Sequence, residues 1–138
     1  MPRMIFVNLP VADLTKSIAF YESIGATKNP QFSDDTAACM VISDTIFVMI
    51  LTHDKYRQFT SRPIADATKA SAVLLALSAD DREAVDKMVA HAVQGGGAAD
   101  PGPKQDHGFM YGRSFSDPDG HHWEVFWMDP AAVQGAAA

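Results

Sequence analysis

The sequence predicts an α+β fold built from two βαβββ modules. The modules are expected to form one curved mixed sheet with a concave cup on one face and the helices on its outer face. Two observations predict this fold. Strand-like apolar runs and two amphipathic helical segments follow the order strand, helix, three strands, and this order occurs twice. Each copy has a single helix and too little sheet to bury both of its faces, so the two copies are expected to pack side by side.

The first copy opens with the β-rich run RMIFVNL at residues 3–9, which Pro10 ends. Asp13 is placed to cap a helix, and Gly25 follows the last turn of that helix as its stop signal. The apolar face of the helix, spaced as a helix requires, comprises Leu14, Ile18 and Tyr21. The other strands of this copy are expected around 27–33, 37–43 and 45–52.

The second copy opens with the apolar strand SAVLLALS at residues 71–78, about 68 residues after the start of the first. Asp80, with Glu83 three residues later, resembles a capping box. The helix behind it is stopped by the glycines of 95–97. Its buried face is expected to comprise Val85, Met88, Val89 and Ala92. Further strands are expected near 98–103, at 109–116 and at 121–128, with Asp117-Pro118-Asp119-Gly120 as the turn before the last.

We therefore predict that residues 1–138 form a single domain. Module one spans about 3–53 and module two about 71–128. The polar segment 54–70 is expected to be a linker that passes over the cup, and residues 131–138 are expected to form a flexible tail.

Composition excludes several classes of protein. The chain has 138 residues, of which 47% are hydrophobic and 20% charged, and its formal net charge is −6. This acidic balance argues against binding to nucleic acid or to an anionic membrane. No apolar run is long enough to cross a membrane, and the N-terminus lacks the features of a signal peptide. The single cysteine, Cys39, excludes an internal disulfide and is expected to be a small buried hydrophobe. We expect a cytoplasmic protein.

Two segments about 100 residues apart resemble a known superfamily. VNLPVADLTKSIAFYESIGA resembles the opening strand and helix of the vicinal-oxygen-chelate superfamily, and FSDPDGHHWEVF resembles its last hairpin. That superfamily includes glyoxalase I, bleomycin-resistance and fosfomycin-resistance proteins, and extradiol dioxygenases. With HGFMYGRSF before the turn, the chain is most similar to a glyoxalase-like subgroup whose members often carry lyase or dioxygenase names. The matching residues of the first segment are Val11, Asp13, Leu14, Ser17, Phe20, Tyr21 and Gly25.

The resemblance implies metal ligands at four positions that face the cup, one in the first and one in the last strand of each module. In this sequence those positions hold Phe6, Met49, Leu74 and Glu124. Strand alternation agrees for the last strand, where Trp123, Val125 and Trp127 should face the helix and leave His122, Glu124 and Phe126 facing the cup. Phenylalanine and leucine cannot ligate, and a thioether suits only soft metals. We therefore expect no metal cofactor at the inherited site.

Other residues offer alternatives for the chemistry of the cup. A relocated divalent-metal site would combine Glu124 with His122, His53 and His107. Without a metal, Glu124 would be a poorly solvated carboxylate in an apolar cup, suited to act as a general base or acid. A purely structural role for Glu124 is the other interpretation. We predict a ligand-binding set of Phe6, Asn8, Met49, Leu74, Tyr111, Arg113, His122 and Phe126.

Two functional hypotheses follow. In the first, the protein is a superfamily member with a degenerate metal site that binds a small, partly apolar molecule in its cup, as bleomycin-resistance proteins do. In the second, it is an enzyme of the lyase, isomerase or dioxygenase type that uses Glu124, with or without a relocated metal. The resemblance also implies a homodimer, because related proteins commonly build the cup at a dimer interface.

Overall fold

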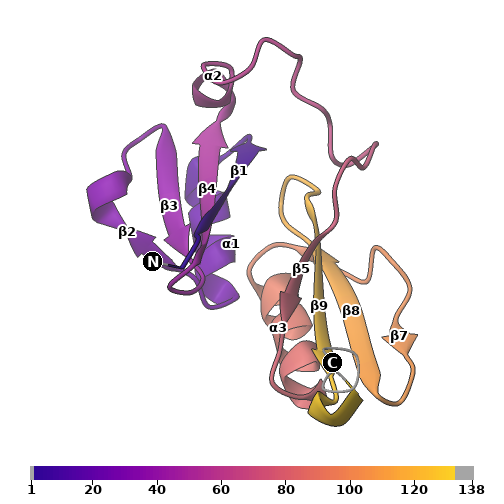
Figure 1. Ribbon diagram of the computed structural model, residues 1–138. Helices are drawn as coiled ribbons and strands as arrows, with labels where there is room; N and C mark the ends of the chain where they lie inside the picture. Colours follow the sequence, from indigo (N-terminus) through magenta and orange to yellow (C-terminus); the bar gives the residue numbers. More distant parts are fainter. Residues whose placement is uncertain (1, 133–138) are drawn as a thin grey trace.

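The computed structural model describes residues 2–132 and confirms the α+β class, with two modules that lie side by side (Figure 1). Module one contains β1 (Ile5–Val11), α1 (Leu14–Ser23), β2 (Thr27–Asn29), the 3-10 turn η1 (Pro30–Phe32), β3 (Ala37–Val41) and β4 (Ile46–Thr52). Module two contains β5 (Leu75–Ser78), α3 (Arg82–Gln94), β6 (Ala98–Ala99), β7 (Gln105–Asp106), β8 (Met110–Ser116) and β9 (His122–Met128). A short helix, α2 (His53–Tyr56), begins the segment between them. Within residues 2–132, we find no helix with the length and apolar character needed to cross a membrane.

The strands form two hydrogen-bonded sheets, whereas one continuous sheet was predicted. Module one has the strand order β1-β4-β3-β2, and module two has the order β5-β9-β8-β6, with β7 pairing with the same edge of β8. In each sheet the first strand runs parallel to the last strand of its module. The free edges of β1 and β5 therefore do not pair with each other, and this break leaves room for a cavity between the modules.

Strand alternation places one face of each sheet against its own helix. Leu9 and Val11 of β1 lie in the core with Phe20 and Tyr21 of α1, and Asp13 caps α1 by accepting a hydrogen bond from the backbone N–H of Lys16. In module two the core takes Leu77, Val85, Val89, Trp123 and Val125, among others. Within residues 2–132, α1 and α3 each cover one face of their sheet and leave the opposite face open, as the fold class predicts (Figure 1).

Several predicted boundaries are wrong for local reasons. The strand expected at 27–33 ends at Asn29, because Pro30 begins the 3-10 turn. The cap of α3 is Asp81 rather than Asp80. Residues 54–56 of the expected linker belong to the helix α2, which begins at His53 with Thr52 as its cap. Residues 133–138 of the predicted flexible tail lie outside the described residues.

The second strand-like run also begins later than predicted. Residues 71–74 are not in a strand, and β5 starts at Leu75. Alternation along this run would place Val73 against the helix, but Val73 is 61% exposed. Ile5, at the start of β1, is likewise exposed, at 56%. Both residues precede the part of the strand that the helix covers.

The turn Asp117–Gly120 joins the two modules. Tyr21 of α1 donates a hydrogen bond from Oη to Asp117 Oδ2 at 2.7 Å, and the Trp123 indole N–H donates to the same Tyr21 oxygen at 3.1 Å. Asp119 accepts a hydrogen bond from the backbone N–H of Ala12 at 2.8 Å. Burial raises the pKa of Tyr21, so its phenol stays protonated and acts as the donor. The turn, predicted only as a chain reversal, therefore fixes module two against module one.

Candidate functional site

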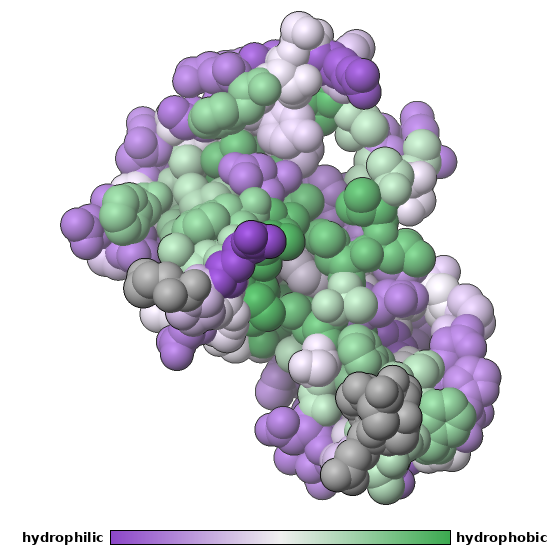
Figure 2. Space-filling view, viewed as in Figure 1, coloured by the Kyte–Doolittle hydropathy of each residue, from purple (hydrophilic) through white to green (hydrophobic). Residues whose placement is uncertain are grey.

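A cavity of about 660 Å³ lies between the two modules, beneath the linker. Its walls come from the free edge strands β1 and β5, from the turn before β9 and from residues 65–73, which comprise the end of the linker and the segment before β5. Figure 2 shows apolar residues gathered in the hollow between the modules. A volume of this size suits a small organic molecule.

Most of the cavity wall is apolar, and a few polar side chains interrupt it. The apolar part is contributed by Val7, Leu9, Pro10, Ala65, Ala67, Ala70, Ala72, Val73, Leu75 and Pro101. Asn8, Tyr56, His121 and His122 supply most of the polar groups able to orient a ligand. His121 Nε2 is already used, because it lies 2.7 Å from the carbonyl oxygen of Pro10 and donates to it in the Nε2–H tautomer. The sequence predicted Asn8 and His122 at the ligand site, and both border this cavity.

His122 borders this cavity and lies beside Glu124, which borders a second pocket. The Nε2 atom of His122 is buried and has no hydrogen-bond partner among the described residues. Glu124 Oε2 lies 3.7 Å away, beyond hydrogen-bonding distance. The loop between β6 and β7 folds over the His122 ring, since Gly102 donates its N–H to Ser114 Oγ at 2.9 Å and a side chain at Gly102 would touch that ring. The loop therefore holds the imidazole in place and encloses its Nε2 atom.

The second pocket has a volume of about 330 Å³ and contains Glu124. It lies on the open face of module two, where Ala76 and Phe126 flank Glu124. The Glu124 side chain is 44% exposed, so the expectation of a poorly solvated carboxylate enclosed by apolar groups is wrong. Glu124 and Phe126 were both predicted at the site, and the structure brings them together here.

The other three positions at which the superfamily places metal ligands do not lie near Glu124 within one chain. Phe6 and Met49 lie on the open face of module one, where Phe6 stacks on Phe47 with ring centroids 4.6 Å apart. Leu74 precedes β5 and is 57% exposed. The strand register supports the alignment of the modules, because Met49 pairs with Asn8 just as Glu124 pairs with Ala76. Phe6, Met49 and Leu74 also lack the ligand atoms that a hard divalent cation prefers, so these positions do not fit the metal that the fold family implies.

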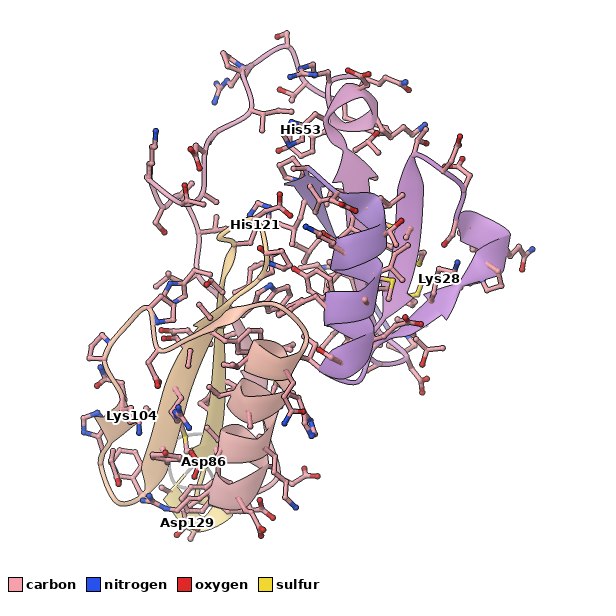
Figure 3. The ribbon with its side chains drawn as sticks, turned by 180° about the vertical axis from the view of Figure 1, so that it is seen from behind. Lys28, His53, Asp86, Lys104, His121 and Asp129 are labelled. Atoms are coloured by element: carbon pink, nitrogen blue, oxygen red, sulfur yellow. The ribbon has the colours of Figure 1, made fainter. Side chains whose placement is uncertain are left out.

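The relocated metal set is not assembled in one chain either. His53 begins α2 and borders, with His121, a further cavity of about 610 Å³ under the linker (Figure 3). His107 lies in the turn before β8, beside the Phe109 ring. Across residues 2–132, no three histidine, cysteine, aspartate or glutamate side chains gather in a way that would hold a metal ion.

The sequence placed Tyr111 and Arg113 among the ligand-binding residues without deciding which way Arg113 points, and neither side chain lies on the open face of the sheet. They pair across the hairpin with Trp127 and Val125 and so share the helix-facing side of the sheet. Arg113 donates to Asp100 at 2.7 Å and to Asp86 at 3.0 Å, and the Tyr111 hydroxyl donates to Asp86 at 2.7 Å. These bonds tie α3 to β8.

We predict that Arg113→Gln destabilises the protein without weakening ligand binding. The Arg113 hydrogen bond holds the pKa of Asp100 below its ordinary value of 3.8, as the Tyr111 hydrogen bond does for Asp86. Hydrogen bonds to charged groups contribute about 1.5–3 kcal/mol, and partial exposure of both carboxylates reduces this, so we expect a loss of about 1–2 kcal/mol in the free energy of unfolding. Chemical denaturation at several pH values measures it. The loss should be full above pH 3.8 and shrink as the pH falls and the carboxylates protonate.

Sequence reasoning missed several residues of the site. The linker residues, Tyr56 and Ser116 border the larger cavity, and Met110 and Met128 border the smaller one. The strand register of the hairpin could have identified the methionines. The turn before β9 places Ser114 opposite Glu124, and the same register, continued away from the turn, places Met110 opposite Met128 on the same face of the sheet. No comparable signal exists for the linker, because it has no regular pairing.

Comparison with known proteins agrees with the fold and identifies the family. The sequence profile of the Glyoxalase/Bleomycin resistance protein/Dioxygenase superfamily matches residues 3–125. No curated protein sequence matches the chain.

Solved structures with the same fold cover nearly the whole chain. A hypothetical protein from S. aureus, SA1046, is 29% identical, with a TM-score of 0.75 over 92% of this chain and 95% of the other. A glyoxalase/bleomycin resistance protein/dioxygenase family enzyme from Burkholderia phytofirmans is 20% identical, with a TM-score of 0.73 over 92% of this chain and 99% of the other. The fosfomycin resistance protein FosX from Listeria monocytogenes is 20% identical, with a TM-score of 0.65 over 92% of this chain and 91% of the other. This chain belongs to the glyoxalase/bleomycin resistance protein/dioxygenase superfamily, whose profile spans both of its βαβββ modules.

Proposed function

We propose that the protein binds a small, partly apolar molecule in the cavity between its modules, without the metal that its superfamily often uses. The observation that carries this proposal is the cavity itself, about 660 Å³ in volume, with a largely apolar wall and a few polar side chains. Three of the four inherited metal positions hold Phe6, Met49 and Leu74, which supports a binding role over metal-dependent lyase or dioxygenase chemistry.

A cavity-filling substitution tests this proposal. Ala67 lies in the linker and borders the cavity, so Ala67→Trp should place an indole ring in the space that a ligand would use. N-phenyl-1-naphthylamine, a neutral fluorescent probe with one N–H donor, should bind the unchanged protein. The Ala67→Trp substitution should weaken that binding at least roughly tenfold, as measured by fluorescence titration.

The matched control is Ala90→Trp, which adds the same ring on the exposed side of α3. It should leave the affinity for the probe unchanged. The proposal fails if the probe does not bind the unchanged protein, or if both tryptophan variants bind it equally well.

A metal-free enzyme is the second candidate function, and the arrangement of His122 and Glu124 favours it. His122 borders the larger cavity, Glu124 borders the smaller pocket, and their side chains lie 3.7 Å apart, so an imidazole and a carboxylate stand close enough to share acid–base work on a bound molecule. Elemental analysis of protein purified without a histidine tag distinguishes the two metal-free proposals, a binding protein and a metal-free enzyme, from a metal-dependent enzyme. We expect no stoichiometric transition metal. Stoichiometric metal that is lost in Glu124→Ala would overturn both metal-free proposals.

Turnover of the methylglyoxal–glutathione adduct then decides between enzyme and binding protein. As a binding protein, the chain should show no turnover, with or without added Ni²⁺ or Zn²⁺. Turnover without metal that His122→Phe and Glu124→Gln each abolish would favour the enzyme.

We also propose that the protein forms a homodimer through the open face of module one. Phe6 is 48% exposed there and stacks on Phe47, beside Met49. Sedimentation equilibrium at micromolar concentration should show a dimer that Phe6→Glu dissociates, because burying a charge in an apolar interface is unfavourable. Phe32→Glu, which changes an exposed ring on the 3-10 turn, is the control and should remain dimeric. A monomeric unchanged protein would contradict the proposal.

The cytoplasmic location stays a prediction from the sequence.

A further inference from the structure

The pocket around Glu124 has an unusual combination of one anion and a soft apolar wall. Its volume is about 330 Å³. Its apolar wall includes the thioethers of Met110 and Met128, the ring of Phe126 and the side chains of Ala76 and Pro103. Glu124 is its only acidic side chain. Thioethers and an aromatic ring are polarisable and adapt to apolar groups of varied shape.

No lysine or arginine among the described residues forms an ion pair with Glu124. The nearest basic group is the His122 imidazole at 3.7 Å, which is charged only when protonated. The carboxylate is 44% exposed, so it retains solvent at the mouth of the pocket while its neighbours are apolar. Its negative charge is therefore open to a cation that enters with the ligand.

The arginines around the pocket already have partners. Arg113 also borders the pocket, but its guanidinium is bonded to Asp86 and Asp100. Lys104, in the loop beside β7 (Figure 3), contributes to lowering the pKa of both of these aspartates. Arg82 pairs with Asp106 at 2.9 Å. An anionic ligand would thus meet the Glu124 carboxylate while both arginines are already paired, and this disfavours carboxylates and phosphates.

Metal ions fit the pocket poorly as well. A hard divalent cation needs several oxygen or nitrogen ligands, and the pocket offers one carboxylate. An organic ammonium group needs fewer directed contacts. It is attracted by a carboxylate and by the face of an aromatic ring, and its carbon chain can pack on the methionines. The net charge of the chain, −6, also favours the approach of a cation.

We propose that the Glu124 pocket binds an organic cation, an amine or quaternary ammonium group carried on an apolar chain or ring. Glu124 supplies the opposite charge, Phe126 supplies an aromatic face, and Met110 and Met128 hold the apolar part. The inference rests on the proposed binding function, to which it adds the charge of the ligand.

Three probes of matched shape test this inference: 4-phenylbutylamine, 4-phenylbutanol and 4-phenylbutyrate, which are cationic, neutral and anionic at pH 7. Isothermal titration calorimetry should rank their affinities in that order. Glu124→Gln should lower the affinity for the amine roughly tenfold while leaving that for the alcohol within about twofold. Phe126→Leu keeps an apolar wall and should weaken binding of the amine more than that of the alcohol.

The control is Glu83→Gln, which removes the same charge from an exposed position on α3, where Glu83 pairs with Lys87. It should leave all three affinities unchanged, and thermal unfolding should show that Glu124→Gln remains folded. If the alcohol binds as tightly as the amine while N-phenyl-1-naphthylamine still binds the larger cavity, the inference about charge is overturned and the proposed function stands. If neither the three probes nor the naphthylamine binds, both are overturned.

Discussion

Replacing Asp117 with alanine is expected to lower the free energy of unfolding by about 2–4 kcal/mol. The Asp117 side chain is buried and accepts hydrogen bonds from Tyr21 Oη and from the backbone N–H groups of Asp119 and His121. Each buried donor left without an acceptor costs about 1–3 kcal/mol, and relief of the desolvated carboxylate offsets part of the total. Urea denaturation measures the change.

Asp44→Ala is the control for this prediction, because Asp44 is exposed in the corresponding turn of module one. It should change stability by no more than about 0.5 kcal/mol. Equal effects of the two substitutions would show that the Asp117 turn does not hold the modules together.

Stability should also depend on pH through Asp117. Desolvation by burial is the main cause that raises the pKa of Asp117 above its ordinary value of 3.8. The carboxyl therefore ionises less readily in the folded protein, so its contribution to stability is greatest below pH 3.8 and is lost as the pH rises through the raised value. Asp117→Asn keeps an acceptor but cannot ionise. The stability of the unchanged protein minus that of this variant should fall from acid to neutral pH, and a constant or rising difference would contradict the account.

Replacing Gly120 with alanine is expected to displace the linker and weaken ligand binding. Gly120 has a φ of +87°, and a Cβ atom there would lie 2.8–3.0 Å from atoms of Thr68 and Ala67 in the linker. The linker would have to move off the turn, and the cavity beneath it would open. We expect a loss of about 1–3 kcal/mol in stability and a roughly tenfold weaker affinity for N-phenyl-1-naphthylamine.

Gly25→Ala separates backbone strain from displacement of the linker. Gly25 has a similar φ of +104°, but among the described residues no atom outside Gly25 and its two chain neighbours lies within 4 Å of the position that its Cβ would take. This variant should lose comparable stability and keep the affinity of the unchanged protein for the probe. If Gly120→Ala binds the probe as tightly as Gly25→Ala does, the linker does not close the cavity.

Local patterns in the sequence predicted much of the fold. The helix signals at Asp13 and Gly25 and the alternation along β9 are set by neighbouring residues, and the structure confirms them. The direction in which the Arg113 side chain points could also have been predicted from the sequence. The hairpin turn places Arg113 opposite Val125, and alternation had already assigned Val125 to the helix side of the sheet. The prediction for Arg113 rested on its chemistry alone, without counting across the hairpin.

The cavity itself could not be predicted in this way. It depends on the distance between β1 and β5, two strands that do not pair, and on the path of a linker without regular structure. Glu124 illustrates the same limit. Alternation placed it on the open face correctly, but its exposure depends on how the β6–β7 loop packs around it.

Chemical-shift mapping with N-phenyl-1-naphthylamine tests the central claim most directly, because it locates the ligand on the molecule. In ¹H–¹⁵N spectra of the unchanged protein, the largest shifts at saturation should fall on residues of β1, on linker residues 65–73 and on Gly120, His121 and His122, which border the cavity. Shifts confined to other surfaces, or a saturated complex with no change in these residues, would contradict the claim that the cavity between the modules is the binding site.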